Sequence, residues 1–485
     1  MNTVRLDGMR FVNESGNQVL FHGINVLARD RKDGHLYPWI YQAMPYFQRS
    51  GFNLIRLGIF WDGAEPEPGK IDYGYLEKLR EIVGLAEKHG IYVILDMHQD
   101  LFAQKFIDGA PDWACLDEGL PHPANCDLWY QAYLSSDAII RAADNFWANK
   151  PAADGIGLLD HYSAMWEEIA KVFDSCPNLL GFEPMNEPFM GSIARNSFGE
   201  ASAVMAQKYP GFDLAHPEKI TPQAQGEFMG LIAQRFLEFD RTTLMDFYRR
   251  MERAIRKHSE KPVVTGGNIY CSTNLPTGIQ RLGSAQIFAP HGYDTVVDSD
   301  RYDNFSRENV ERLYAEKRQD QERLALPTIV GEWGAFPSKE FTGDLIRHMN
   351  GILERYLWGD AYCEYHPGME NDQHFDALRR GYPMETGGNL LRYHDDPQES
   401  RFEMEFEAKA GGETVIYCPF TPKGITCSLT WEENRQLLES GACLCRVTVK
   451  EGGQAKLVLE GLDVNAVNLK TEYLRDPMGI DVERP

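Results

Sequence analysis

The sequence lacks a long hydrophobic run and an excess of positive charge. No stretch of its 485 residues approaches the roughly 18 consecutive apolar residues that a membrane-spanning helix needs. Lys and Arg number 49 against 72 Asp and Glu, a formal net charge of −23. Nucleic acid binding usually rests on clustered Lys and Arg. We therefore expect no stable membrane insertion and no nucleic acid partner, and the oligomeric state stays open.

Cysteine is scarce and forms no metal or disulfide pattern. Nine cysteines occur without a CxxC pair, which predicts reduced thiols rather than a zinc ribbon or a disulfide framework. Cys115 and Cys126 flank the loop "CLDEGLPHPANC" and could pair in an oxidising compartment. The start "MNTVRLDGMRF" lacks a secretory signal pattern, which predicts a cytoplasmic protein. A secreted protein whose leader had been removed would read the same.

The apolar residues that are present, 43% of the chain, alternate between two patterns. From about residue 19 to 368, short β-rich runs alternate with helical runs, which is typical of repeated βα units around a parallel sheet. We predict an α/β fold with a (β/α)8 barrel in residues 1–385. The eight candidate strands are 19–26, 53–61, 92–100, 179–188, 262–268, 285–293, 327–334 and 361–368.

One helix is clearly predicted between the second and third strands. In "YLEKLREIVGLAEKHG", Leu76, Leu79, Val83 and Ala86 recur at helical spacing, and Gly90 ends the pattern. Strand, helix and strand together make one βαβ unit.

Two segments on the mouth side of the barrel are longer than ordinary loops. They span residues 101–160 and 189–240, and both are rich in aromatic residues and methionine. One interpretation is a pair of helical insertions with a small core of their own. The other is that part of this apolar surface forms the wall of a substrate cleft, because long loops at a barrel mouth often build the binding site.

After residue 385 the hydrophobic period changes from 3.6 to two. "FEMEFEAK" places Phe402, Met404 and Phe406 on one side of a strand, and "CRVTVKEGGQAKLVLEG" reads as two strands joined by a Gly-Gly turn. We predict an antiparallel β-sandwich in residues 386–485. It contains no reactive group of residues and is best interpreted as a packing or substrate-presenting module.

Polar residues follow the apolar runs of most candidate strands. Because the carboxyl ends of barrel strands surround one common mouth, these side chains should converge there as a catalytic site. They are Asn25, Arg56, His98, Asn186, Glu187, His291, Tyr293 and Glu332.

Two of these residues fit the chemistry of a retaining glycosidase. Such an enzyme needs two carboxyl groups about 5 to 5.5 Å apart, one neutral and one ionised. Glu187 ends the fourth strand and Glu332 ends the seventh, and these strands face one another across the mouth. The two carboxyl groups can therefore meet although 145 residues separate them.

The neighbours of the two glutamates suggest different roles. Tyr293 and Arg56 would donate hydrogen bonds to Glu332 and lower its pKa, which favours it as the nucleophile. Glu187 would then be the acid/base and would need a pKa raised by apolar surroundings and by the second carboxylate. His98 and Asn186 would orient the sugar.

A third glutamate, Glu183, lies on the same face of the fourth strand as Glu187. Side chains alternate along a strand, so residues four apart share a face, and Glu183 would lie deeper. Substrate would not reach it there. We interpret Glu183 as a buried structural carboxylate paired with a polar group of a neighbouring strand.

"DMHQD" offers a competing interpretation as a metal site. Asp96, His98 and Asp100 alternate on a strand and could hold a divalent metal together with His291. Barrel metallohydrolases usually carry an HxH pair on the first strand, where this chain has "FHGIN". We therefore expect no metal and no cofactor.

Several motifs together resemble glycoside hydrolase family 5, and specifically its endoglycoceramidase-like branch. They are "FHGINV", "NLIRLGIFWDGAEPEPGKID", "YVILDMHQDLF", "GFEPMNEP", "HGY", "VGEWG" and "RRGYPMETGG", and they cover most of residues 19–395. The resemblance implies a retaining β-glycosidase without a cofactor, acting on the bond between a glycan or single sugar and ceramide. It implies Glu187 as acid/base, Glu332 as nucleophile, and a sugar subsite of Arg56, His98, Asn186, His291 and Tyr293.

The chain departs from that family at two places. The eighth strand normally ends near a tryptophan that stacks under the sugar, but "AYCEYHPG" places Cys363 there and Glu364 beside it, with Tyr365 or Trp358 as substitutes. An added Glu364 would suit extra hydrogen bonds or a cationic group. The other departure is the charged "LARDRKDGHLYP" after the first strand, which contains Arg29, Asp30, Lys32 and His35. Asp100, Glu364 and Tyr365 complete the predicted substrate-binding residues.

These observations predict a retaining β-glycosidase that removes a sugar or short glycan from a hydrophobic aglycone such as ceramide. The alternative is an exo-acting β-glucosidase or β-galactosidase on small amphipathic glycosides. A metal-dependent hydrolase and a noncatalytic carbohydrate-binding protein are further hypotheses. The identity of the sugar and the endo or exo mode stay open.

Overall fold

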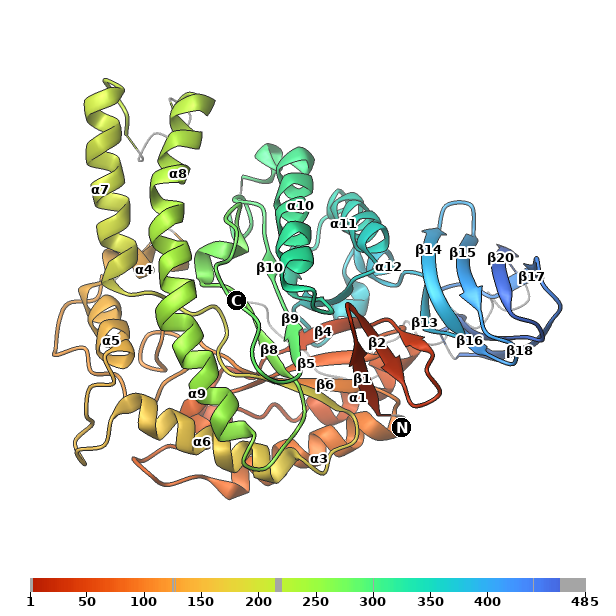
Figure 1. Ribbon diagram of the computed structural model, residues 1–485, viewed down its shortest axis with the longest axis horizontal. Coiled ribbons are helices and arrows are strands. Elements are labelled where there is room, and N and C mark those ends of the chain that lie inside the picture. The colour runs from red at the N-terminus through yellow and green to blue at the C-terminus, as the bar shows by residue number, and fades with distance from the viewer. Residues whose placement is uncertain are drawn as a thin grey trace.

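The computed structural model describes residues 3–123, 126, 128–213, 220–299, 301–438 and 440–462. Figure 1 shows a barrel of strands surrounded by helices, with an all-β part at one end of the molecule. Within these ranges no helix is both long and apolar enough to cross a lipid bilayer.

The barrel is a closed parallel sheet. Its strand order is β10-β11-β12-β4-β5-β6-β7-β8-β9, and a bridge between Phe288 and Thr328 joins β9 to the segment before β11. β9 and β10 are two halves of one strand, so the sheet closes as eight strands and the predicted (β/α)8 barrel is confirmed. The strands are β4 (His22–Val26), β5 (Leu54–Ile59), β6 (Tyr92–Met97), β7 (Leu179–Glu183), β8 (Val263–Thr265), β9 (Gln286–Phe288), β10 (His291–Gly292), β11 (Ile329–Gly334) and β12 (Gly359–Cys363).

Helices cover the outside of the barrel, and the predicted helix between the second and third strands is present as α3. The side chain of Asp72 accepts the N–H of Tyr75 at its start, and Gly90 follows its end with a left-handed φ of 71°. The outer helices are α1 (Ile40–Arg49), α2 (Trp61–Ala64), α3 (Tyr73–Lys88), α6 (Leu158–Phe173), α9 (Met245–Ile255), α10 (Arg307–Leu324), α11 (Thr342–Tyr356) and α12 (Phe375–Leu378).

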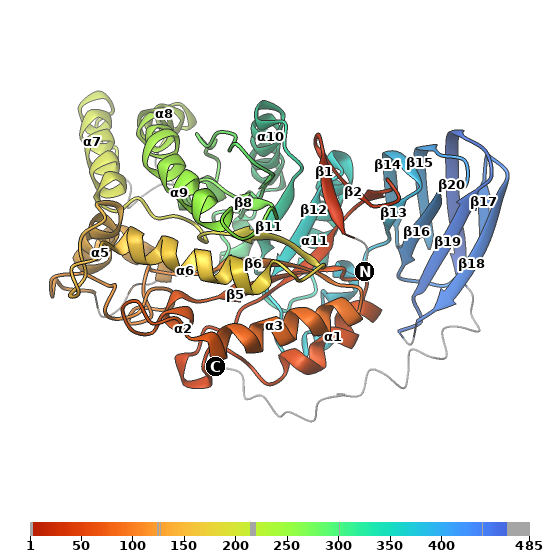
Figure 2. The same ribbon diagram turned by 60° about the horizontal axis from the view of Figure 1, so that its bottom comes forward.

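The two long segments form helices beside the barrel mouth. The first contains α4 (Ala132–Ser135) and α5 (Asp137–Trp147). The second forms an antiparallel pair, α7 (Ser192–Lys208) and α8 (Pro222–Phe239), which projects from the barrel in Figures 1 and 2. Some of their aromatic residues are core, since Phe146 packs edge-on against Tyr162. Cys115 and Cys126 are both free cysteines.

Two antiparallel sheets form the all-β part, as predicted. Figure 2 shows them at the end of the molecule opposite α7 and α8. The four-stranded sheet has the order β14-β15-β20-β17 and the seven-stranded sheet β1-β2-β3-β13-β16-β19-β18. Phe402, Met404 and Phe406 of β15 are buried in the core between them. The strands after the barrel are β13 (Tyr382–Thr386), β14 (Gly388–Asp396), β15 (Arg401–Ala408), β16 (Glu413–Cys418), β17 (Pro422–Cys427), β18 (Trp431–Leu437), β19 (Cys443–Val449) and β20 (Gly453–Leu462).

Two details differ from the expected sandwich. β19 and β20 are not paired as a hairpin, because β19 pairs with β16 and β18 whereas β20 pairs with β15 and β17 in the other sheet. The seven-stranded sheet also includes β1 (Val4–Asp7), β2 (Arg10–Asn13) and β3 (Gln18–Val19) from the amino terminus. The predicted boundary between residues 385 and 386 falls inside β13, and residues 463–485 lie outside the described residues.

Candidate active site

The carboxyl ends of the fourth and seventh barrel strands bring Glu187 and Glu332 together. Glu332 lies in β11 opposite His291 of β10, and Glu187 lies just beyond β7. One carboxylate oxygen of each glutamate and one ring nitrogen of His291 lie within 4.8 Å of one another. Retaining glycosidases hold their carboxyl groups about 5 to 5.5 Å apart and inverting ones about 6.5 to 9.5 Å. The pair is therefore close enough for the retaining mechanism.

Glu332 is surrounded by groups that stabilise its ionised form. Nη1 of Arg56 donates to Oε1 at 2.6 Å, and the hydroxyl of Tyr293 donates to Oε2 at 2.9 Å. Burial alone would raise the pKa of Glu332, but the positive charges of His291 and Arg56 lower it to about 2. Glu332 is thus a carboxylate across the neutral range, as a nucleophile requires.

Glu187 is held by polar groups rather than by the apolar surroundings expected of it. Its Oε1 accepts a hydrogen bond from Oγ of Ser272 at 2.6 Å and lies 2.9 Å from Nδ1 of His291. Nε2 of Gln99 donates to the backbone oxygens of Asn186 and Glu187, whose φ is 38°. A positive φ is unfavourable for glutamate, so these contacts fix a conformation that the chain would not adopt alone.

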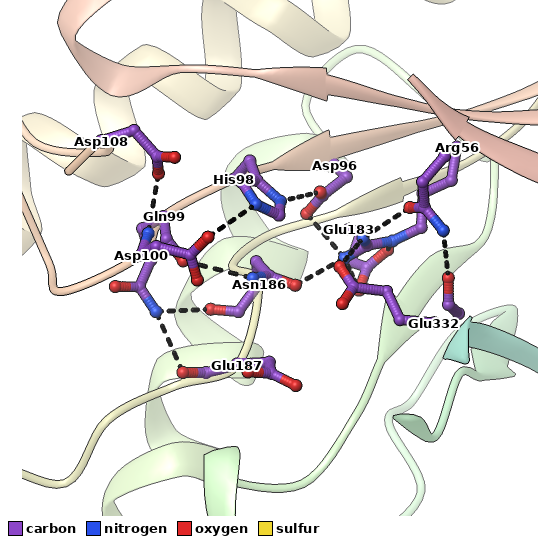
Figure 3. A network of polar contacts seen from close by, with 12 residues as sticks. Arg56, Asp96, His98, Gln99, Asp100, Asp108, Glu183, Asn186, Glu187 and Glu332 are labelled. Carbon is purple, nitrogen blue, oxygen red and sulfur yellow. Dashed lines mark hydrogen bonds and ion pairs between the residues drawn. The ribbon is translucent and has the colours of Figure 1, made fainter. Parts of the chain in front are cut away.

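Arg56 organises the floor of the site, as Figure 3 shows. It is fully buried, and its N–H groups donate to Glu183, Glu332, Asn25 and Asn186 at 2.6 to 3.0 Å. Those four partners use all five of its donors, so none is left for a sugar. Arg56 therefore positions Glu332 instead of gripping substrate. Glu183 binds it through both carboxylate oxygens and is 3% exposed, which fits the predicted structural role.

His98 and Asp100 lie beside the two glutamates on the wall that follows β6 (Figure 3). Nδ1 of His98 is 2.8 Å from Asp96, and its Nε2 is 3.5 Å from Asp100. Burial alone would lower the pKa of His98, but Asp96 and Asp100 raise it well above its usual value. One nitrogen of this buried imidazole is therefore directed at Asp100, which lines the cavity.

Arg29, after β4, and Glu364, after β12, continue this charged lining next to Asp100. Nη1 of Arg29 is 2.6 Å from Glu364, and its Nε is 3.2 Å from the fully buried Asp108. Burial and the nearby Asp100 raise the pKa of Asp108 to about 7. Of the other residues in the charged loop after β4, His35 binds Asp62 at 3.1 Å and does not line the cavity.

A cavity of about 640 Å³ connects these residues, and its two ends differ in chemistry. One end carries the charged side chains of Arg29, His98, Asp100 and Glu364. The other end is lined by the loops after β6, β8 and β10, where aromatic and aliphatic side chains lie beside the polar Thr273, Asp294 and Asp298. The aromatic and aliphatic residues are Trp129, Tyr130, Tyr133, Ile269, Tyr270 and Val297.

All but one of the predicted site residues fall into two groups in the structure. His98, Asp100, Glu187, Tyr293, Glu332 and Glu364 line the cavity. Arg56, Asn186 and His291 lie behind it and contact the two glutamates or Arg56.

Tyr365 does not belong to the site, and neither does Trp358. Tyr365 is 5% exposed and packs against Trp39 and Phe47, because the chain after β12 turns this ring outward toward α1. Trp358 is buried and donates to Gln321 at 2.7 Å. Cys363 itself lines the cavity at this place.

Sequence reasoning missed two residues that contact the site. Ser272, which donates to Glu187, follows β8 in "GGNIYCS". Its hydroxyl, shortly after the fifth barrel strand, is the sequence feature that could have predicted it. Asp108 lies in the long segment after β6, without a periodic pattern to mark it.

The alternative metal site is not assembled as proposed. Asp96 is 3.0 Å from Arg56, and His291 contacts Glu187, so neither is grouped with Asp100. His98, Asp100 and Asp108 do place one ligand atom each within 4.8 Å of one another. The guanidinium of Arg29, however, already supplies a cation to the two aspartates of that group.

Comparison with known proteins identifies the family. The family model described as Cellulase (glycosyl hydrolase family 5) matches residues 12–347, more than half of the chain. The chain belongs to glycosyl hydrolase family 5. The resemblance found in the sequence is thereby confirmed at the level of the family.

Individual relatives support the endoglycoceramidase-like branch of family 5. The chain is 31% identical to an endoglycoceramidase of Cyanea nozakii over 244 residues, which cover 44% of this chain and 47% of that protein. It is 24% identical to endoglycoceramidase I of Rhodococcus hoagii over 435 residues, covering 84% and 78%. The first of these matches thus spans about half of the relative's length.

The fold is shared with a solved member of the branch. Endo-glycoceramidase II from Rhodococcus sp. superposes with a TM-score of 0.73 at 21% identity, covering 92% of this chain and 98% of that chain. That protein has also been solved as a ganglioside GM3 complex and as a lactosyl-enzyme intermediate. At this identity the likeness shows the fold alone.

The hydrogen bond from Tyr293 to Glu332 makes a prediction about pH dependence. In a Tyr293→Phe variant the pKa of Glu332 should rise from about 2, because one donor to the carboxylate is gone. The acidic limb of kcat/KM should move to higher pH, and kcat should fall by about 10- to 100-fold. A pH–rate profile of the variant and the unaltered enzyme from pH 2 to 8 on an aryl glycoside measures both effects. An unchanged acidic limb would contradict this role.

The arrangement of the charged groups also predicts insensitivity to chelators. Incubation with EDTA should leave kcat within about 2-fold, because Arg56 and His291 supply the positive charge beside Glu332. The measurement is activity before and after chelation and after addition of Mn²⁺ or Zn²⁺. Loss on chelation with recovery on adding metal would favour the metal-dependent hydrolase instead.

Proposed function

We propose that this protein is a retaining β-glycosidase that cleaves the bond between a sugar and a hydrophobic aglycone, with glycosphingolipids such as glycosylceramides as substrates. The observation that carries the proposal is the pair Glu187 and Glu332. The two lie within 4.8 Å of one another, in unlike environments, where a charged wall meets an aromatic wall. The names of the endoglycoceramidase relatives support this choice of aglycone.

The reaction would proceed in two steps. Glu332, ionised and aligned by Arg56 and Tyr293, attacks the anomeric carbon while Glu187 protonates the departing glycosidic oxygen. The aglycone leaves and a glycosyl ester on Glu332 remains. Glu187 then takes a proton from water, which attacks the same carbon and releases the sugar with its original configuration.

The wall around this pair supplies binding rather than chemistry. His98 and Asp100 are placed to hold sugar hydroxyls, whereas Asn186 is 1% exposed and donates to the backbone of Gln99 behind the cavity. The aromatic end would take the aglycone, since apolar surface there gains from the removal of water. Phe236 of α8 stacks at 4.9 Å on Tyr270, so the projecting helix pair supports that end.

A product screen tests the proposal. The substrates are glucosylceramide, galactosylceramide and lactosylceramide in detergent, and each is tested beside the matching aryl β-glycoside. For at least one sugar, we expect both the ceramide and the aryl glycoside to be cleaved to free sugar and free aglycone. Absence of turnover on all of them, with glycoside binding retained, would favour a noncatalytic carbohydrate-binding protein. The cytoplasmic location expected from the amino terminus stays a prediction.

Trp129 provides a test of the aglycone end. It lines the cavity, and its Nε1 donates to Asp298 at 2.9 Å, which joins the loop after β6 to the loop after β10. Trp129→Ala should raise KM for a glycosylceramide about 10-fold, since about 1.4 kcal/mol of apolar contact is lost. KM for a 4-nitrophenyl glycoside should change about 3-fold or less. Tyr73→Ala, at an exposed site on α3, is the control, and equal effects on both substrates would contradict the assignment.

A further inference from the structure

The two glutamates divide the barrel mouth into two halves. Glu187 follows β7 and Glu332 lies in β11, so the loops after β8 and β10 lie on one side of the pair, and those after β12, β4, β5 and β6 on the other. The long segment after β6 also reaches the β10 side, where Trp129 donates to Asp298. Ser272, which binds Glu187, follows β8. Because Glu187 protonates the departing oxygen in the proposed reaction, the aglycone leaves on the β8 side. The sugar therefore lies toward β12 and β4.

A chain of ion pairs crosses the sugar half of the mouth. Nη1 of Arg29, in the loop after β4, lies 2.6 Å from Glu364, which follows β12. Nε of Arg29 lies 3.2 Å from Asp108 and 3.7 Å from Asp100, both in the segment after β6. These four side chains come from three loops, and we call them the Arg29 bridge. Arg29, Asp100 and Glu364 of the bridge line the cavity.

The bridge is anchored below the cavity surface. Asp108 is fully buried, and its Oδ1 accepts the backbone N–H of Asp100 at 2.7 Å. Asp100 in turn lies 3.5 Å from Nε2 of the buried His98. Arg29 thus contacts two neighbouring carboxyl groups at once, those of Asp100 and of the buried Asp108. These contacts hold the inner end of the bridge in place, and the side chains of Arg29 and Glu364 at its outer end are 30% and 34% exposed.

We infer that the Arg29 bridge limits the site to one sugar, so that the enzyme removes a single terminal monosaccharide and does not release an oligosaccharide as one unit. This inference rests on the proposed glycosidase function. In a pyranose ring C4 lies across from C1, so a sugar with C1 between Glu187 and Glu332 directs its C4 hydroxyl toward the bridge. The bridge can donate to and accept from that hydroxyl. The cavity continues past Glu364 along His366 and Asp372, so the bridge crosses the path that a second sugar linked through O4 would take.

The experiment compares monosaccharide and disaccharide release by the unaltered full-length enzyme. The substrates are the 4-nitrophenyl β-glucoside, β-galactoside, β-lactoside and β-cellobioside, and chromatography identifies the free sugars. Monosaccharide release from at least one monoglycoside should exceed disaccharide release from either diglycoside by about 100-fold or more.

Two variants test the bridge itself. Glu364→Ala removes one end of the ion pair and opens the wall, and Glu364→Gln keeps its volume while removing the charge. The ratio of disaccharide to monosaccharide release should rise about 10-fold or more in Glu364→Ala and less in Glu364→Gln. Arg31→Ala is the control, because Arg31 lies in the same loop but pairs with Asp62 outside the cavity. Its ratio should match that of the unaltered enzyme.

The possible results test three claims separately: the limit to one sugar, the role of the Arg29 bridge and the proposed glycosidase function. Disaccharide released efficiently by the unaltered enzyme would overturn the inference and would place a second sugar beyond Glu364, near His366 and Asp372. Monosaccharide release with no gain in the folded Glu364→Ala and Glu364→Gln variants would overturn the role of the bridge. No turnover of any glycoside would instead refute the proposed function. Circular dichroism and thermal unfolding establish that each variant is folded.

Discussion

Replacing Glu332 by glutamine should lower kcat/KM for an aryl β-glycoside by about 10⁴-fold or more. The reason is that the amide cannot form the glycosyl ester, whereas Glu332 is held as a carboxylate with a pKa of about 2 by Arg56 and Tyr293. Steady-state rates on a 4-nitrophenyl glycoside, with a detection limit below this loss, provide the measurement.

The control for this variant is Glu67→Gln, at an exposed position after β5. It should keep the activity of the unaltered protein. Arg56 retains Glu183 and Asn25 as partners in Glu332→Gln, so the variant should fold. If folded Glu332→Gln turned over substrate like the unaltered protein, the retaining mechanism would be refuted. If neither protein turned over substrate, the noncatalytic carbohydrate-binding protein would be the remaining hypothesis.

Replacing Glu187 by alanine should have an effect that depends on the leaving group. On a glycosylceramide, whose aglycone alcohol needs a proton to depart, kcat/KM should fall by about 10² to 10⁴-fold. On a 2,4-dinitrophenyl glycoside, which departs without a proton, the first step should be nearly unaffected, and kcat should be limited by the second step. Comparing the two substrates separates acid catalysis from a general structural defect.

Azide provides the second part of the Glu187→Ala experiment. A small anion fits where the carboxylate stood and attacks the glycosyl ester without base catalysis. It should raise kcat on the dinitrophenyl glycoside and give a β-glycosyl azide, which chromatography and NMR identify. Ser272→Ala is an informative companion, because it removes the hydroxyl that holds Oε1 of Glu187 and keeps the carboxyl group. It should show no azide product, and rescue of both variants would contradict the assignment of Glu187.

Much of the barrel and its mouth could be predicted because each signal was local. A parallel barrel strand is short and buried, and the residue at its end faces the mouth, so Glu332 after "IVG" and His98 after "ILDM" could be placed without knowing the pairing. The family motifs then added roles to residues that the pattern had already located.

The features that were missed depend on contacts between distant segments. The strands at residues 4–19 join the sheet of β13 through pairs such as Glu385 with Val19, which no local pattern shows. Buried and exposed side chains alternate along β19 and β20 as a strand requires, but this periodicity does not show which sheet each strand joins. Tyr365 follows Glu364 directly, and the turn of the chain after β12, invisible in the sequence, sends the ring toward Trp39.

The central claim is that Glu332 and Glu187 act as nucleophile and acid/base in a double displacement. The most direct test is ¹H NMR of the first sugar released from a β-glycoside, recorded before the anomers equilibrate. The account predicts the β anomer, because two inversions at the anomeric carbon restore its configuration. Initial release of the α anomer would contradict it, because a single inversion requires water, and not Glu332, as the attacking group.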